Sequence, residues 1–153
     1  MSLDWARASR FGGPEDSLGF LLWQVSHRWQ RAIGAALAPL DLTHLQFVLL
    51  TCTGWLMKGG QPPSQAELAA FSKIEPMQVS QVVRLLEKKK LLARAPHPAD
   101  SRAKALRLTA AGEKLVRRAV PLVEAADAAF FAASARPALL RQLRALAANG
   151  DAP

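Results

Sequence analysis

Several features that mark whole classes of proteins are missing from this sequence of 153 residues. Cys52 is its single cysteine, so no disulfide can form within the chain, which fits a reducing cytosol. No apolar run approaches the roughly 18 residues of a membrane-spanning helix, and the first residues lack a signal-peptide core. We therefore expect a cytoplasmic protein without a membrane partner.

The motifs of enzymes are also missing. His27, His44 and His97 lie far apart, with no carboxylate or cysteine at metal-ligand spacing. The sequence has no glycine-rich phosphate loop and no nucleophile motif. We expect no catalytic activity, no metal and no cofactor.

The sequence does have a large basic excess. Its 20 Lys and Arg residues against 12 acids give a net charge of +8, and the chain from Lys73 to Arg107 holds nine cations but only three acids. Half of the residues are hydrophobic, enough for the core of one domain. A basic surface can serve solubility alone, but one this concentrated favours a polyanion, and nucleic acid before an acidic protein or a membrane surface.

One segment, from Pro76 to Lys90, is predicted to be a helix with two unlike faces. Pro76 suits a first helical position, and Val79, Val82, Val83 and Leu86 fall on one side. The other side carries amides, a hydroxyl and cations without an acid: Met77, Gln78, Ser80, Gln81, Arg84 and Lys88. An ordinary solvated face is the alternative, but these groups also suit base edges and phosphates.

Around this helix the sequence predicts a helix, a turn, the second helix and then a hairpin. Ser64 and Glu67 form a capping-box pattern for the first helix. Residues 93–95 and 104–109 read as two strands, and the turn between them carries Arg102 near its tip. The whole of 64–109 therefore predicts a helix-turn-helix with a basic two-stranded wing.

Helices are predicted on both sides of this unit. Ser17 precedes a helix that reaches Leu37, Thr43 and Gln46 form a second capping box, Thr109 precedes a helix to about residue 133, and a last helix over 138–148 stops at Asn149–Gly150. Pro121 should kink the third of these at a cost of ~3 kcal/mol. The first helix has too much apolar surface for one-sided burial, so a second chain could cover the remainder. The lead before it, 1–14, is expected to be mobile or to pack on that second chain.

Together these residues resemble the MarR (multiple antibiotic resistance regulator) family of dimeric winged helix-turn-helix transcription regulators. The resemblance rests on the order and spacing of Leu42–Thr43, Gln46–Phe47, Gln65–Ala69, Val79–Ser80, Leu86–Lys89, Leu91, Arg94, Asp100–Arg102, Leu106–Thr109 and Gly112. It implies a mainly α fold with a small β-hairpin wing, and one intertwined domain. In that domain 1–40 would be the arm and first dimerisation helix, 41–109 the DNA-binding lobe, and 110–153 the C-terminal dimerisation helices.

The resemblance also implies roles for individual residues. Arg102 would enter the minor groove, braced by a charge-assisted bond from Asp100. The major groove would receive Met77, Gln78, Ser80, Gln81 and Arg84, and the phosphates would meet Lys88, Arg94 and Lys104, with Ser64 also in the DNA-contacting set. The function implied is that of a homodimeric repressor of double-stranded DNA, released from a pseudo-palindromic operator by a small ligand.

Its effector pocket would lie between the dimerisation helices and the lobe. Trp23, His27, Phe47 and Trp55 could line it and suit a flat aromatic ligand, although such side chains also serve as plain core. Two other functions stay open. One is redox sensing through Cys52, which its apolar surroundings disfavour; the other is a basic helical dimer that binds a protein instead of DNA.

Three residues depart from the family pattern. Lys73 and Lys90 stand at turns where glycine is common, and a left-handed lysine costs about 1 kcal/mol relative to glycine. We therefore expect the two turns to take another conformation. Glu75 is a poor cap for the second helix of the motif.

Overall fold

The computed structural model describes residues 3–100, 102 and 104–148. Its elements are α1 (Trp5–Ala8), η1 (Pro14–Asp16), α2 (Leu18–Leu37), η2 (Ala38–Leu40), α3 (His44–Met57), α4 (Gln65–Ser72), α5 (Pro76–Lys88), β1 (Leu92–Pro96), β2 (Lys104–Leu108), α6 (Ala110–Phe130) and α7 (Arg136–Ala148). The mainly helical fold with one antiparallel hairpin is as predicted. The expected stop at Asn149–Gly150 lies outside the described residues.

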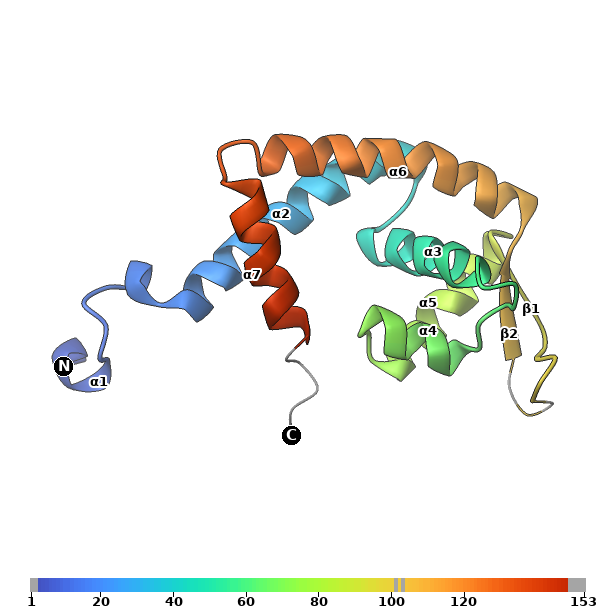
Figure 1. The fold of residues 1–153 in the computed structure, drawn as a ribbon, viewed down its shortest axis with the longest axis horizontal. Helices are drawn as coiled ribbons and strands as arrows, with labels where there is room; N and C mark the ends of the chain where they lie inside the picture. Colours follow the sequence, from blue (N-terminus) through green and yellow to red (C-terminus); the bar gives the residue numbers. More distant parts are fainter. Residues whose placement is uncertain (1–2, 101, 103, 149–153) are drawn as a thin grey trace.

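The elements form two parts (Figure 1). Helices α3, α4 and α5 and the hairpin make a lobe beneath one end of α6. Helices α2, α6 and α7 form what we call the arm: α2 packs against α6, and α7 folds back from the far end of α6. The described ends of the chain both lie on the arm side, away from the lobe.

The four helix starts predicted from capping residues are confirmed. The hydroxyls of Ser17, Thr43, Ser64 and Thr109 each accept a hydrogen bond from a backbone N–H in the first turn. At Thr43 and Ser64 the reciprocal bond of a capping box is present as well. The Ser64 backbone N–H donates to the Glu67 carboxylate and thereby lowers the pKa of that group. These starts are encoded within three residues, which is why the sequence reveals them.

A hydrophobic core fills the lobe and extends to the arm. Helix α3 is its centre, with Leu49 and Leu50 fully buried, and it contacts α4, α5, β2, α6 and α2. Helix α5 contributes the predicted apolar side, and the C-terminal half of α2 contributes Ile33 and Leu37. The lobe is therefore joined to the arm by continuous packing.

The expectation of altered turns at the two lysines is wrong. Lys73 (φ 56°) ends α4 and Lys90 (φ 57°) follows α5, and both are left-handed. Behind Lys90, the Leu91 N–H donates to the Leu86 carbonyl at 2.9 Å, a bond that closes the helix end around a left-handed residue. The surrounding backbone bonds and packing therefore hold a conformation that lysine alone disfavours by about 1–2 kcal/mol.

Two other elements differ in detail from the prediction. Pro121 is exposed and lies inside α6, which stays one helix from Ala110 to Phe130 and is gently arched in Figure 1. The lead before α2 contains the short helices α1 and η1. Among the described residues no single helix has the length and apolar content to cross a membrane. The segments Leu18–Leu40 and His44–Met57, which are bent by 79° relative to one another, reach that length and composition only as a pair.

Candidate nucleic-acid interface

Helix α5 presents the predicted polar face to solvent. Val79, Val83 and Leu86 are fully buried on its inner side. The outer side exposes Met77, Gln78, Gln81, Arg84 and Lys88, whereas Ser80 is half-buried. Pro76 starts the helix, and Glu75 before it makes no side-chain cap, as expected. The exposed groups are hydrogen-bonding amides and cations on a rigid element, which is what contact with base edges and phosphates needs.

The single acid of helix α5 is paired with an arginine of the wing. Glu87 Oε2 accepts from Arg94 Nη2 at 2.6 Å and from Arg94 Nε at 2.9 Å. Arg94 lies on β1, so the pair joins the helix to the first strand of the wing. Both side chains are about one-quarter to one-third exposed. Arg94 is thus paired within the protein, and its predicted contact with phosphate stays a prediction.

The wing places its cations where the sequence predicted. In the antiparallel pairing Leu92 faces Leu108 and Pro96 faces Lys104. Arg102 and Lys104 are exposed near the tip. Asp100 Oδ1 accepts from the backbone N–H of Arg102 at 2.9 Å, a contact that stabilises the turn. The predicted charge-assisted bond from Asp100 to the Arg102 guanidinium stays a prediction.

The start of the helix-turn-helix is attached to the wing. Ser64 forms an isolated bridge with Ala105, and the Leu106 N–H donates to the Pro63 carbonyl at 2.8 Å. The Ser64 hydroxyl itself serves the capping box of α4. Helices α4 and α5 and the wing therefore form one connected unit.

Three consecutive lysines, Lys88 to Lys90, stand at the end of α5, and Lys89 is paired within the protein. Lys89 Nζ donates to the Asp41 carboxylate at 2.9 Å and to the Asp41 carbonyl at 2.5 Å. This bond ties the end of α5 to the turn before α3. Lys88, one residue earlier, is exposed on the polar face.

The four residues predicted to line an effector pocket are not brought together within one chain. Trp23 and His27 lie on the exposed half of α2, with ring centroids 4.1 Å apart and His27 Nδ1 2.9 Å from the Trp23 carbonyl. Phe47 belongs to the core and is 9% exposed. Trp55 is 61% exposed and lines a cavity.

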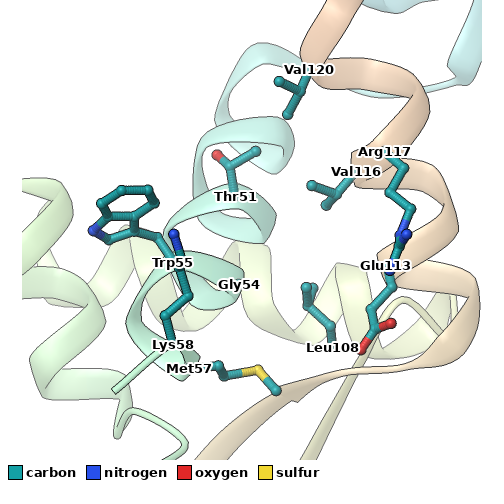
Figure 2. A pocket seen from close by; sticks show the side chains of 10 residues that line it. All are labelled: Thr51, Gly54, Trp55, Met57, Lys58, Leu108, Glu113, Val116, Arg117 and Val120. Atoms are coloured by element: carbon teal, nitrogen blue, oxygen red, sulfur yellow. The ribbon is translucent and has the colours of Figure 1, made fainter. Parts of the chain in front are cut away.

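That cavity, of about 500 Å³, lies between α3 and the first turns of α6 (Figure 2). Figure 2 shows Val116 and Val120 pointing from α6 towards Thr51 on α3. The complete lining is Thr51, Gly54, Trp55, Met57, Lys58, Leu108, Glu113, Val116, Arg117 and Val120. Lys58 Nζ lies 4.3 Å from the centre of the Trp55 ring, so a cation and an aromatic face meet at its edge.

The sequence reasoning missed the α6 side of this cavity. Glu113, Val116, Arg117 and Val120 recur at spacings of three and four residues, which places them on one helix face. The apolar members of that face have the spacing of ordinary buried helix positions, and the recurrence of Arg117 among them was the available signal.

Cys52 is half-buried, and burial raises the pKa of its thiol. A raised pKa lowers the fraction of thiolate, which is the reactive form. No group of three His, Cys, Asp or Glu side chains within the described part of the chain is arranged to hold a metal ion.

Comparisons with known proteins agree with this geometry. The family described as "ArnR1-like, winged-helix domain" matches residues 39–125. YdcH of Bacillus subtilis, described as an uncharacterized HTH-type transcriptional regulator, is 50% identical over 126 residues, which cover 82% of this chain and 86% of that protein.

Two solved structures extend the comparison. The MarR family protein Rv2887 of Mycobacterium tuberculosis, in complex with salicylic acid, is 34% identical with a TM-score of 0.62, covering 88% of this chain and 96% of that one. The transcriptional repressor CouR of Rhodococcus jostii, bound to a 23-mer DNA duplex, is 26% identical with a TM-score of 0.76, covering 96% and 99%.

Proposed function

Because the chain belongs to the MarR family of winged helix-turn-helix transcription regulators, we propose that it is a homodimeric repressor that a small aromatic acid releases from its operator. The observation that carries this is the outer face of α5, where amides and cations are exposed and the single acid of the helix is paired with Arg94. The protein would act in the cytoplasm on double-stranded DNA.

In the proposed complex α5 enters the major groove. Gln78, Gln81 and Arg84 are the exposed side chains that could read base edges, and Met77 could touch a thymine methyl group. Arg102 at the wing tip would reach the flanking minor groove, and Lys88 and Lys104 would meet phosphates. Ser80, half-buried, and Ser64, which caps α4, would contribute less than the exposed residues.

The proposed dimer rests on the apolar surface of the arm. Leu18 is 85% exposed and Leu22 55% exposed on α2, and Leu146 on α7 is 65% exposed. Exposed apolar side chains gathered on the helices of the arm are typical of a surface that another chain covers. Residues 1–40 and 110–153 would thus form the dimerisation part, and two lobes would meet major grooves about 34 Å apart.

The cavity between α3 and α6 is the proposed effector site. Its volume lies within the usual range of ligand pockets, about 300–1,000 Å³. Its lining is mostly apolar, and the two cations Arg117 and Lys58 outnumber the single carboxylate of Glu113, a balance that suits an acidic ligand. Because α3 belongs to the lobe and α6 to the arm, a ligand there would favour one relative position of the two parts, with a coupling of about 1–3 kcal/mol.

The first test is binding of the protein to DNA upstream of its own coding region, against a shuffled fragment, over a salt series. We expect specific binding, and we expect Arg84→Ala to lose about 1–3 kcal/mol of operator affinity, since it removes a base-reading side chain. Arg118→Ala, an exposed arginine of α6 that lies on neither α5 nor the wing, is the matched control and should bind normally.

Equal binding of both fragments would show that recognition is unspecific. No binding at low salt would refute the DNA-binding proposal and favour a basic dimer that binds a protein, whose apolar interface responds little to salt.

The second test titrates the protein–operator complex with salicylate, the compound bound to Rv2887. We expect salicylate to weaken operator binding, and Arg117→Ala to reduce that response by about tenfold in salicylate concentration, because it removes a cation of the cavity. Arg118→Ala again serves as control, since Arg118 does not line the cavity. An unchanged response in Arg117→Ala would place the effector elsewhere.

A further inference from the structure

The chain that leaves α5 and the start of α6 meet at a small junction, which we define as Lys90, Leu91, Thr109 and Gly112. The Thr109 hydroxyl donates to the Lys90 carbonyl at 2.7 Å and accepts from the Gly112 N–H at 3.0 Å. A hydroxyl can do both, because it has one proton and two lone pairs. One side chain therefore satisfies a carbonyl at the C-terminal end of α5 and an N–H at the N-terminus of α6.

The backbones at this junction are in direct contact as well. The Thr109 N–H donates to the Leu91 carbonyl at 3.1 Å. Gly112 is buried, and a Cβ atom at this position would lie 2.1 Å from the Leu91 carbonyl oxygen. Only glycine allows so close an approach, so the first turn of α6 is seated directly on the chain that leaves α5.

The junction stands between the proposed effector cavity and the DNA-binding face. Leu108, Glu113 and Val116 flank Thr109 in the chain and line the cavity. Helix α5 lies on the other side of the junction, with Lys90 held in its left-handed conformation. Thr109 therefore connects the start of α6 directly to the end of α5.

We propose that Thr109 is a positioning residue whose hydroxyl fixes the direction of α5 relative to α6 and so sets the affinity for the operator. This inference rests on the proposed DNA binding. If Thr109 were only a helix cap, its loss would lower the stability of the protein as the loss of any other cap does. It would not change the position of α5 in particular.

Thr43 provides a matched comparison within the same chain. Its hydroxyl also accepts from the N–H three residues on, Gln46, at 3.2 Å, and so caps α3 as Thr109 caps α6. The bond to a second helix end is what distinguishes Thr109. The same substitution at Thr43 and at Thr109 therefore separates the loss of a helix cap from the loss of the connection between α5 and α6.

The decisive variant is Thr109→Asp. Aspartate is a good N-cap and can still accept from the Gly112 N–H, but a carboxylate has no proton to donate to the Lys90 carbonyl. Thr43→Asp adds the same charge to the other cap, and Thr109→Ser restores the hydroxyl. Operator affinity, the thermal midpoint and amide hydrogen exchange are measured on the full chain.

We expect Thr109→Asp to fold, to weaken operator binding at least about tenfold, and to speed amide exchange in residues 85–91, at the end of α5 and just beyond it. Thr109→Ser and Thr43→Asp should bind within about twofold of the parent. Equal weakening by Thr43→Asp, or parent-like affinity and exchange in Thr109→Asp, would overturn the inference. If the parent protein binds no operator, the proposed function fails, and unchanged exchange in residues 85–91 would still overturn the coupling on its own.

Discussion

Helix α3 and the first half of helix α2 are both rich in apolar residues, but their own chain covers only α3. Leu49 and Leu50 of α3 are fully buried, whereas Leu18 and Leu22 of α2 are 85% and 55% exposed. Further along α2, Leu37 is fully buried in the core shared with the lobe. Under the proposed function, this difference would assign the assembly of two subunits to the open end of the arm and DNA reading to the lobe.

The largest expected effect comes from a charge placed on the exposed apolar surface of the arm. Leu22→Glu would place a charge in the proposed dimer interface, and burying an unpaired carboxylate there should raise the dimer dissociation constant at least about 100-fold. Sedimentation velocity over a concentration series measures it. Because the lobe makes its core without Leu22, the far-ultraviolet circular dichroism of the variant should remain helical.

Gln24→Glu is the matched control, since it adds the same charge to an exposed polar position of the same helix. A dimer equally stable in Leu22→Glu and the parent would show that the open half of α2 does not hold two subunits together.

The parts of the fold that could be predicted from the sequence are those that local patterns encode. The starts of α2, α3, α4 and α6 were predictable because each cap is a bond across three residues. The buried side of α5 followed from helical spacing. The wing was predicted from alternation and charge, and its two strands form at the predicted positions, over Leu92–Pro96 and Lys104–Leu108.

What was missed depends on contacts between distant segments. The left-handed turns at Lys73 and Lys90 require knowledge of the packing that holds them. Glu87 and Arg94 meet only because α5 and β1 are joined by a turn, a geometry no local pattern encodes. The Thr109 hydroxyl reaches Lys90 across 19 residues, and the cavity arises from two helices, α3 and α6, that are separated in the sequence by α4, α5 and the wing.

A smaller effect sharpens the comparison on the lobe side. Lys90→Gly should stabilise the protein by about 1 kcal/mol, because glycine adopts the left-handed backbone at φ 57° without the clash of a Cβ atom. Thermal or urea unfolding measures the change.

Lys90→Ala removes the same charge while keeping the strained backbone, so it should leave stability within about 0.5 kcal/mol of the parent. A similar gain from both substitutions would mean that charge repulsion around the three consecutive lysines, and not backbone strain, is what glycine relieves.

The smallest effect lies where arm and lobe meet. Trp29 of α2 donates its indole N–H to Asp127 of α6 at 2.6 Å, and the ring of His44, at the start of α3, stands edge-on to Trp29 with centroids 5.0 Å apart. Burial lowers the pKa of His44 below its usual value of 6.5, although the Asp127 carboxylate acts in the opposite direction. The folded protein therefore binds this proton less readily than the unfolded chain.

The consequence is a pH dependence with a defined sign. The unfolded chain takes up the His44 proton first, so stability should fall as the pH drops through 6.5 and level off only below the lowered pKa. Urea unfolding between about pH 7.5 and about pH 5.5 should show a shallower slope in His44→Gln than in the parent. An identical slope would mean that the contact around His44 opens enough to hydrate the ring, and that the contact of α2 and α6 with α3 is looser than the packing within the lobe.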